Sequence, residues 1–201
     1  MTLVEDLVVR ELGRVAYAQT FAAMKSFTAT RSEATADEIW LLEHEPVYTV
    51  GQGSAATAKV QNGIPLVRSD RGGDITYHGP GQVVLYGLID IGRRGIKVRE
   101  YVRLLEQTVI DALGRGERKP GAPGVYVAGA KIAALGIRVR QGRAYHGLSL
   151  NVDMDLSPFH AIDPCGYPGL AVTQMKDLGF NEDCMSVGKR LAGVLREKLD
   201  A

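Results

Sequence analysis

The sequence has few of the residues and segments that mark secreted, membrane-bound or metal-dependent proteins. Its 201 residues include only two cysteines, Cys165 and Cys184, too few to suggest a disulfide framework. No apolar run approaches the ~20 residues of a membrane helix. The first residues lack both the basic and the apolar regions of a signal peptide. We therefore expect a soluble, cytoplasmic protein with no membrane partner.

An excess of charge of one sign is also missing. The chain has 24 Lys and Arg against 23 Asp and Glu, which gives a formal net charge of +1. No global field attracts nucleic acid, and we expect no nucleic-acid partner. Basic residues do cluster locally, which is typical of solvated faces but also suits an acidic protein partner. These clusters are Arg93, Arg94, Lys97 and Arg99, and Arg138, Arg140 and Arg143.

The length and the 45% apolar content are sufficient for one domain with a substantial core. Strand and helix patterns mix without strict βαβ alternation, which favours an α+β fold over a doubly wound Rossmann fold. We predict a mixed β-sheet with helices packed on its faces, in the manner of an α/β sandwich.

Hydrophobic periodicity and turn residues locate the elements. Helices are predicted over 15–31, 98–113 and 187–199, the last capped by Ser186, with one short helical turn in 173–178. Strands are predicted over 38–50 (interrupted at Pro46), 64–67, 83–91 and 124–128. A hairpin is also predicted, in which strand 131–139 pairs with strand 144–152 through a turn at 141–142. Polar, Gly/Pro-rich connections are expected at 114–123 and 153–169.

Residues 71–82 combine four glycines and a proline with polar and aromatic side chains. Glycine lets a backbone approach a ligand closely and adopt positive φ. An irregular loop of this composition indicates a binding surface more than a spacer. The alternative is a tight multi-turn connection between strands. The strand that follows is apolar on both faces, so the loop leads into the core.

Lys131 is an ionisable residue on an apolar strand face. Alternation places it with Ala133, Leu135, Ile137 and Val139. Such a lysine either snorkels from the strand end or is held in a site for its chemistry. Periodicity alone favours snorkelling.

The predicted hairpin turn sets small residues opposite one another. Gly136 faces Gly147, and Ala134 and Ser149 lie beside them. Small facing residues leave a furrow in which an extended ligand can lie against backbone. A bend or bulge in the hairpin explains the glycines equally well.

Cys165 lies between turn-forming residues, in Asp-Pro-Cys-Gly-Tyr-Pro-Gly at 163–169. This setting gives the thiol the steric access that a nucleophile needs, although a structural role is equally compatible with it. Cys184 stands beside Asp183, which disfavours a thiolate, and we expect it to be inert. His160, Asp163 and Cys165 do not have a common zinc spacing, and neither Cys-x-x-Cys nor His-Glu-x-x-His occurs, so no metal is expected.

Several motifs together resemble the lipoyl(octanoyl) transferase family. They are Arg-Gly-Gly-x-x-Thr-Tyr-His-Gly-Pro-Gly-Gln at 71–82, Ala-Lys-Ile-Ala-Ala-Leu-Gly-Ile at 130–137, His-Gly-Leu-Ser-Leu-Asn-Val at 146–152 and Ile-Asp-Pro-Cys-Gly at 162–166. Glu-His-Glu-Pro-Val-Tyr-Thr-Val-Gly at 43–51 is similar to the upstream segment of that family. The resemblance implies a fold similar to the catalytic domains of biotin and lipoate protein ligases. It also implies one octanoyltransferase catalytic domain over 1–201, which we expect to be a monomer.

The resemblance further implies an acyltransferase that needs no cofactor. It would move an octanoyl group from octanoyl-acyl carrier protein to a lysine of lipoyl domains, in 2-oxoacid dehydrogenase complexes and in the glycine cleavage H protein. Cys165 matches the family's acyl-enzyme cysteine and Lys131 its partner. The substrate-contacting residues would be Arg71, Gly72, Gly73, Asp74, Ile75, Thr76, Tyr77, His78, Ala134, Leu135, Gly136, Gly147, Leu148 and Ser149. Ser149 replaces an expected alanine, and Gln52 stands where a basic residue is common.

A thiol with a pKa of about 8.5 forms little thiolate at neutral pH. A nearby ammonium increases the thiolate fraction, because its positive charge lowers the pKa of the thiol. We hypothesise that Lys131 is first the counter-ion of the Cys165 thiolate and then, once Cys165 is acylated, the base for the incoming lysine. His78 either positions a reacting group or is a hydrogen-bonding core histidine. The sequence does not assign the donors of an oxyanion hole.

Two rival functions remain at this point. An ATP-dependent lipoate or biotin protein ligase on the same fold would need no cysteine, although no Gly-x-x-x-x-Gly-Lys-Ser/Thr loop for phosphate is present. A non-catalytic module that binds carrier or lipoyl domains would explain the basic clusters and the furrow. It would leave Cys165 and Lys131 without a role.

Overall fold

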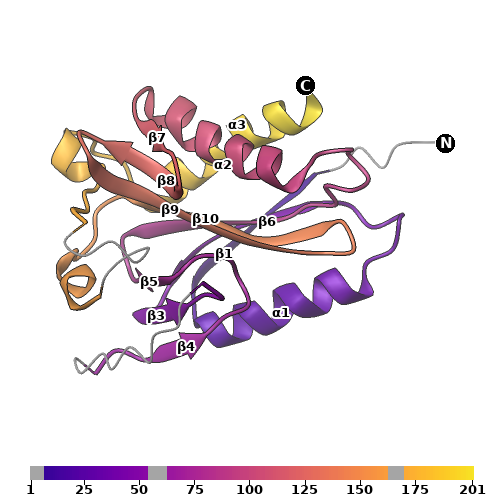
Figure 1. Cartoon of the computed structure of the whole chain (residues 1–201), viewed down its shortest axis with the longest axis horizontal. Coiled ribbons are helices and arrows are strands. Elements are labelled where there is room, and N and C mark those ends of the chain that lie inside the picture. Colours follow the sequence, from indigo (N-terminus) through magenta and orange to yellow (C-terminus); the bar gives the residue numbers. More distant parts are fainter. Residues whose placement is uncertain (1–6, 54–62, 163–169) are drawn as a thin grey trace.

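The computed structural model describes residues 7–53, 63–162 and 170–201, arranged in layers (Figure 1). The central layer is a seven-stranded sheet whose spatial order is β1 (Val8–Val15), β2 (Glu38–His44), β6 (Gln82–Leu88), β10 (Arg143–Asn151), β9 (Ala130–Arg140), β8 (Ala122–Val127) and β7 (Glu117–Lys119). One face is covered by α2 (Val98–Leu113) and α3 (Cys184–Asp200). On the other side lie α1 (Tyr17–Thr30) and a small sheet in the order β4 (Leu66–Arg68), β3 (Val47–Val50) and β5 (Ile75–His78).

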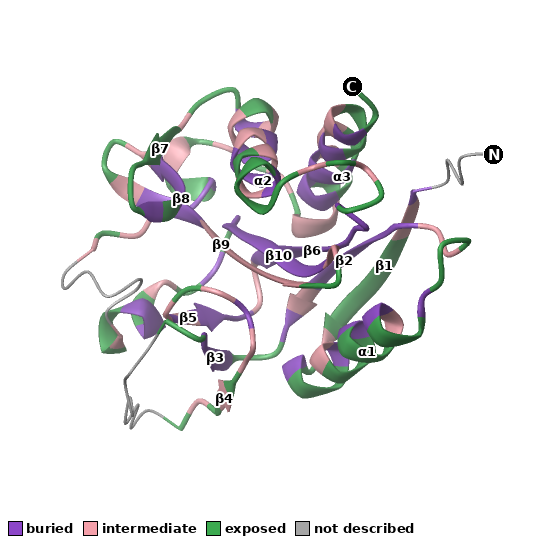
Figure 2. Cartoon of the chain, turned by 45° about the vertical axis from the view of Figure 1, so that its right-hand side comes forward, coloured by how far each residue is buried: buried purple, intermediate pink, exposed green. Residues whose placement is uncertain are grey.

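The predicted α+β fold is confirmed. β1 pairs with β2 in parallel, and the other pairs of the central sheet are antiparallel, so the sheet is mixed. Each face of this sheet has its own apolar core (Figure 2). The core under α2 and α3 includes Leu41, Leu85 and Leu148, and the core under α1 includes Leu42 and Val84.

The helix over 98–113 has the predicted bounds because one apolar stripe faces the sheet: Tyr101, Leu105, Val109 and Leu113 are buried. The last helix begins earlier than predicted, at Cys184, and its cap is Asp183 rather than Ser186. The Asp183 side chain accepts a hydrogen bond of 2.9 Å from the Ser186 amide, as an N-cap residue does. Among the described residues, no helix has the length and apolar character that a membrane span requires.

Three segments predicted as irregular contain regular structure. Within the glycine-rich stretch 71–82, Ile75–His78 forms β5, because it pairs antiparallel with Val47–Val50. The predicted connection 114–123 contains β7 and the start of β8, which form a hairpin. The predicted loop 153–169 contains a short 3-10 helix, η1 (Ser157–Ala161). The short helical turn predicted in 173–178 is confirmed, since Lys176–Leu178 forms the 3-10 helix η3. Local composition hides β5 in particular, because its pairing partner is remote in sequence.

The predicted register of the long hairpin is confirmed: Gly136 pairs with Gly147, and Ala134 pairs with Ser149. The interpretation of the glycines as an open furrow is wrong in part. A Cβ added at Gly136 would lie 2.8 Å from the Gly72 carbonyl oxygen, and one at Gly147 would lie 2.2 Å from the Leu85 carbonyl oxygen. These glycines therefore let neighbouring backbone approach.

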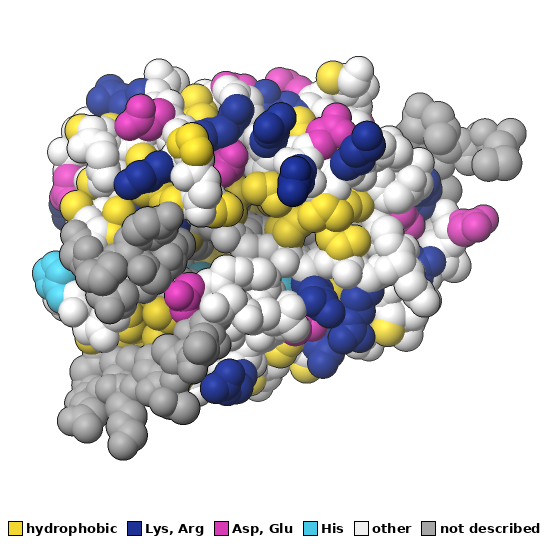
Figure 3. All heavy atoms as spheres, in the orientation of Figure 1, with side chains coloured by type: hydrophobic (Ala, Val, Ile, Leu, Met, Phe, Trp, Pro, Cys, Tyr) yellow, Lys and Arg dark blue, Asp and Glu magenta, His cyan; other side chains and the backbone are white. Residues whose placement is uncertain are grey.

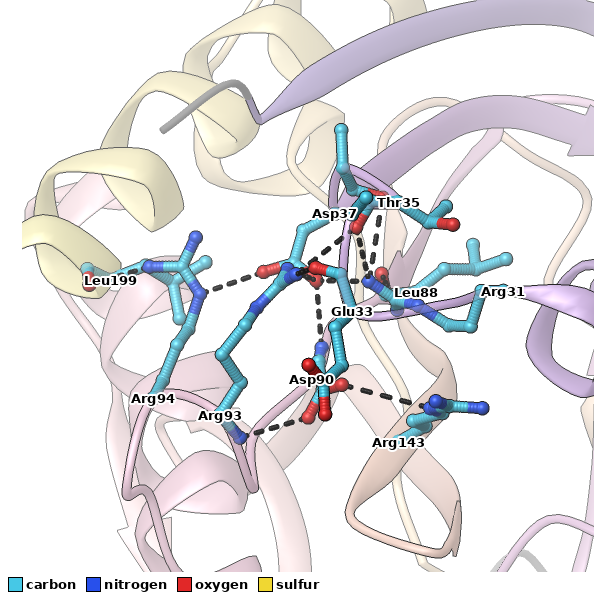
Figure 4. A network of polar contacts seen from close by, with 12 residues as sticks. Arg31, Glu33, Thr35, Asp37, Leu88, Asp90, Arg93, Arg94, Arg143 and Leu199 are labelled. Atoms are coloured by element: carbon cyan, nitrogen blue, oxygen red, sulfur yellow. Dashed lines mark hydrogen bonds and ion pairs between the residues drawn. The ribbon is translucent and has the colours of Figure 1, made fainter. Parts of the chain in front are cut away.

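Part of the predicted basic clusters forms a buried network around Asp37 (Figure 4). The Asp37 carboxylate binds Arg31, Arg93 and Arg94 at 2.6, 3.0 and 2.8 Å. Burial acts to raise the pKa of Asp37, but hydrogen bonds from the Asp90 amide, Arg94 and Arg31 outweigh it and lower that pKa. Arg94 also donates to the Leu199 carbonyl at the end of α3. These arginines therefore hold the fold together and do not form part of a free docking surface.

Candidate active site

A cavity lies between the central sheet and the small sheet, at the side covered by the glycine-rich stretch. The central sheet contributes neighbouring positions of three strands, since Val84, Ser149 and Ala134 are cross-strand partners on β6, β10 and β9. The opposite wall comes from Ile75 and His78 of β5. Strands that are distant in sequence therefore converge on one concave site, as binding sites usually require.

Arg71 anchors the glycine-rich stretch over this cavity. Its guanidinium donates to the Thr49 carbonyl at 2.7 Å, to the Thr49 hydroxyl at 2.9 and 3.2 Å, and to the Gly72 carbonyl at 3.0 Å. The Gly72 amide in turn donates to the Ile137 carbonyl of β9 at 2.9 Å. The stretch is thereby tied to both sheets, and its position over the cavity is fixed.

Most of the predicted substrate-contacting residues line this cavity. Gly72 and Tyr77 do not: Gly72 forms the link to β9, and Tyr77 packs with Tyr48 and Phe159 in the core of the small sheet. The residues that line it are Arg71, Gly73, Asp74, Ile75, Thr76, His78, Ala134, Leu135, Gly136, Gly147, Leu148 and Ser149.

Lys131 also lines the cavity and is only 4% exposed. Its Nζ donates to the Pro123 carbonyl at 3.0 Å and lies 5.5 Å from the centroid of the Tyr126 ring. Snorkelling would keep the ammonium in water, so that interpretation is wrong. Burial of an amine at a cavity wall indicates a functional role, because burying it costs free energy that packing alone does not require.

Cys165 lies in 163–169, outside the described residues. The described chain on either side of it reaches the site. Phe159, six positions before Cys165, and Val172, seven positions after it, both line the cavity. The backbone of Lys131 bonds to the carbonyl of Ala171 at 2.8 Å and to the amide of Thr173 at 3.0 Å. Cys184, by contrast, has a pKa raised to about 12 by burial and by nearby carboxylates, beginning with Glu43, which agrees with the expectation that it is inert.

Tyr17, Tyr86 and His146 were not predicted as site residues, yet all three line the cavity. Tyr86 lies on a strand that is apolar on both faces, so alternation could not assign its direction. His146 adopts a φ of +63°, and its Nε2 lies 2.9 Å from an Asp70 carboxylate oxygen. A positive φ and a partner 76 residues away leave no local sequence signal.

The histidines of this region are largely neutral. His78 Nδ1 is hydrogen-bonded to the Gln82 side chain at 2.7 Å, and His44 Nε2 to the Tyr86 hydroxyl at 2.7 Å. Burial lowers the pKa of His78 to about 3, with a further lowering from His44, and burial lowers the pKa of His44 to about 4. His78 is thus a hydrogen-bonded buried histidine that also borders the cavity.

These two histidines predict a pH-dependent stability. Their folded pKa values lie below the unfolded value of 6.5, so the unfolded chain binds more protons and stability falls as the pH drops below 6.5. Near pH 5, each should contribute a slope of about 1.4 kcal/mol per pH unit to the free energy of unfolding. Urea unfolding at pH 7, 6, 5 and 4.5 measures this slope.

His44→Gln should reduce the slope by about 1.4 kcal/mol per pH unit near pH 5, whereas His160→Gln, at an exposed position of η1, should leave it unchanged. Asp70 should not contribute to the slope of stability against pH over this range. Burial acts to raise its pKa, but hydrogen bonds from His146 and Tyr145 outweigh that and lower it to about 2. Its contribution is present above 3.8 and is lost only as the pH falls from there toward 2. An unchanged slope in His44→Gln would contradict the assignment.

The two positions that depart from the family pattern lie at or near the site. The Ser149 hydroxyl is buried in the cavity wall and gives this wall a polar group where an alanine would be apolar. Gln52 accepts a hydrogen bond of 2.6 Å from Arg138. In the described part of the chain, no three His, Cys, Asp or Glu side chains are grouped as metal ligands would be.

Comparison with known proteins places this architecture in a family. Residues 16–195 match the lipoyl protein ligase A/B catalytic domain. The octanoyltransferase of Aromatoleum aromaticum is 61% identical over 198 residues, which cover 96% of this chain and 86% of that protein. The octanoyltransferase of Azoarcus sp. is 60% identical over 191 residues, which cover 92% of this chain and 84% of that protein.

Solved structures with the same fold are more distant in sequence. The bi-partite lipoate protein ligase of Thermoplasma acidophilum superimposes with a TM-score of 0.73 at 18% identity, over 97% of this chain and 85% of the other. The biotin protein ligase of Aquifex aeolicus superimposes with a TM-score of 0.60 at 11% identity, over 96% and 70%. The predicted similarity to biotin and lipoate ligase folds is thus confirmed. The chain belongs to the lipoyl protein ligase A/B catalytic domain family.

Proposed function

We propose that this protein is an octanoyltransferase of protein lipoylation. It takes an octanoyl group from octanoyl-acyl carrier protein, holds it as a thioester on Cys165, and delivers it to a lysine of a lipoyl domain with Lys131 as the partner of Cys165. The observation that carries the proposal is the buried Lys131 in the cavity wall, in a chain about 60% identical to octanoyltransferases.

The contacts of Lys131 suit a group that exchanges a proton. The Pro123 carbonyl holds its Nζ, and the Tyr126 ring lies at cation–π distance. These two contacts orient the amine at the wall of the cavity that it lines. An anion that forms beside an amine oriented in this way is stabilised by its charge.

The chain path supports Cys165 as that anion. Only five residues separate Cys165 from Ala171, whose carbonyl bonds to the Lys131 amide. Phe159 and Val172 border the cavity from the two sides of this segment.

The cavity offers a suitable environment for an eight-carbon chain. Ile75, Val84, Leu135, Leu148 and Phe159 supply apolar wall, and burial of each methylene group contributes about 0.8 kcal/mol to binding. We infer that the predicted substrate residues around them, from the glycine-rich stretch and the β9–β10 hairpin, contact the acyl group and its carbonyl. Exclusion of water there would protect the thioester from hydrolysis.

In the acylation step, the Cys165 thiolate attacks the thioester carbonyl of the donor. A bond forms between Cys165 Sγ and the carbonyl carbon, and the bond to the carrier sulfur breaks. The leaving thiolate takes a proton from the Lys131 ammonium and departs as a thiol. Cys165 is now neutral, and Lys131 is a neutral amine.

In the transfer step, the amine of the lipoyl-domain lysine attacks the octanoyl-Cys165 carbonyl. Lys131 accepts the proton that this amine loses as the amide bond forms. The bond between the carbonyl carbon and Cys165 breaks, and the thiolate leaves beside the newly charged Lys131 ammonium. The resting ion pair is thereby restored, and no cofactor is consumed.

Exposed basic residues outside the Asp37 network suit an acidic protein donor. Figure 3 shows an apolar band across one face, with basic side chains over α2 above it and near α1 below it. Arg99 and Arg103 on α2 and Arg140 on β9 are exposed and form no ion pair with a described residue. Such charges accelerate the encounter with an acidic partner more than they tighten the complex.

Intact-mass analysis after mixing with octanoyl-acyl carrier protein tests the proposal. We expect one octanoyl adduct that hydroxylamine removes, as it removes thioesters. The adduct should disappear in Cys165→Ala and persist in Cys184→Ala, which is the matched control. Transfer to a lipoyl domain should then proceed from the isolated adduct.

Two results would contradict this function. An adduct that survives in Cys165→Ala would place the acyl group elsewhere, and the absence of any adduct would favour a non-catalytic binding module. Modification of lipoyl domains by free octanoate and ATP, retained in Cys165→Ala, would favour an ATP-dependent ligase. We expect no such modification.

A further inference from the structure

A single peptide group connects Lys131 with a buried carboxylate on another layer of the fold. The carbonyl of Pro123 accepts the hydrogen bond from Lys131 Nζ at 3.0 Å. The amide N–H of the same peptide, on Gly124, donates to Glu106 Oε1 at 3.1 Å. The amide therefore lies between a cationic donor and an anionic acceptor, an arrangement in which each hydrogen bond strengthens the other.

Glu106 comes from α2, which packs against β8 and β9. It is only 6% exposed, although carboxylates are rarely buried without a partner. Its second oxygen lies 3.5 Å from Arg118, whose side chain is 40% exposed and therefore neutralises the carboxylate incompletely. The charge of Glu106 thus acts largely on the peptide that faces Lys131.

Gly124 keeps this peptide and Lys131 in contact. Its φ is +147°, a conformation that L side chains rarely adopt. A Cβ added there would lie 2.5 Å from Lys131 Cε and 2.8 Å from the Ala133 carbonyl oxygen. The absence of a side chain lets the Lys131 chain lie directly against the backbone that Glu106 orients.

We propose that Glu106 is a positioning residue for Lys131, acting through the Pro123–Gly124 peptide to hold the amine in place and to favour its charged form. The inference rests on the proposed role of Lys131 in octanoyl transfer. The carboxylate fixes the direction of the Pro123 carbonyl, and its charge reaches Lys131 across one hydrogen-bonded amide. Glu106 therefore determines how readily Lys131 gives up and regains its proton between the two steps.

The sign of the effect follows from this charge. Glu106→Gln keeps an acceptor for the Gly124 amide but removes the negative charge, so Lys131 becomes neutral at lower pH. The ascending limb of the pH profile for transfer from the octanoyl-enzyme should move to lower pH by about 0.5–1.5 units. Because no substrate contact changes, KM for the lipoyl domain should stay within about twofold.

Arg118→Gln gives an effect of opposite sign and does not alter a buried group. Removal of this partly exposed cation leaves Glu106 less neutralised, so the same limb should move to higher pH. Asp111→Asn is the matched control: it removes a carboxylate from the same helix, but one that pairs with Lys198, and it should leave the profile unchanged.

Single-turnover transfer from octanoyl-enzyme to a lipoyl domain, measured across pH 5.5–9 in these variants and in Lys131→Met, tests the inference. Opposite shifts in Glu106→Gln and Arg118→Gln support it. Profiles that superimpose on the wild-type one, while Lys131→Met is inactive, overturn the role of Glu106 alone. If Lys131→Met transfers at the wild-type rate, the proposed role of Lys131 is wrong and this inference fails with it. If Glu106→Gln does not fold, Arg118→Gln alone tests the inference: a shift to higher pH supports it, and an unchanged profile overturns it.

Discussion

Lys131→Arg should separate the two halves of the reaction. The guanidinium stays charged under all working conditions, so it can still stabilise a Cys165 thiolate but cannot act as a base. Acylation from octanoyl-acyl carrier protein should persist at a reduced rate. The guanidinium is wider than an ammonium, and the lysine side chain already packs closely against Gly124. Transfer to the lipoyl domain should fall by about 10²–10⁴-fold, the usual contribution of a general base. The octanoyl-enzyme should therefore accumulate.

Quenched-flow mass spectrometry measures both rates in one experiment, with the acyl-enzyme as the observed species. Lys131→Met should lose both steps, since it retains neither the charge nor the base. Lys176→Arg, at an exposed lysine paired with Asp153, should leave both rates unchanged. Equal losses of acylation and transfer in Lys131→Arg would show that the residue does not change roles between the steps.

The long elements of this fold were predictable because their signals are local. In α2, Tyr101, Leu105 and Val109 repeat at helical spacing, and the glycine that follows Leu113 has the positive φ of a helix terminator. In the long hairpin, the turn at 141–142 together with strand alternation determined the pairing of Gly136 with Gly147. Each prediction required only residues within one element or one turn.

The elements that were missed depend on distant partners. β5 contains only four residues within a glycine-rich stretch, and it becomes a strand because Val47–Val50 lies beside it. The cap of α3 was assigned three residues too late, because Cys184 and Met185 continue the helix before its regular apolar stripe begins. Short strands and helix ends are determined by neighbours that a local pattern does not contain.

The site residues also fall into a group that local sequence signals predicted and a group that they missed. Residues of the quoted motifs line the cavity because the motifs lie on or beside strands that border it. Tyr17, Tyr86 and His146 reach the cavity from an N-terminal helix, a doubly buried strand and a position of positive φ. Their direction depends on how the layers pack. Glu106 is a similar case, since an acid within an amphipathic helix gives no sign that it will bond to the peptide beside Lys131.

Gly147→Ala should be the most destabilising small substitution in the central sheet. Gly147 lies on β10 between Tyr86 of β6 and Gly136 of β9. Its new methyl group would lie 2.2 Å from the Leu85 carbonyl oxygen and 3.3 Å from the Gly87 amide nitrogen, both backbone atoms that no side-chain rotation can move. The two strands must separate, at a cost of about 3 kcal/mol, and Tm should fall by about 6–12 °C.

Gly193→Ala is the matched control, because it makes the same chemical change in a different setting. Gly193 lies on the exposed side of α3, and a Cβ there would meet nothing within 4 Å. The gain in helix propensity should stabilise the protein by about 1 kcal/mol and raise Tm slightly. Calorimetry of the two variants compares a glycine required by strand approach with one that is not. A Gly147→Ala protein as stable as the wild type would mean that β6 and β10 tolerate a wider spacing beside the cavity, so that the close backbone contact at this wall is not needed for the fold.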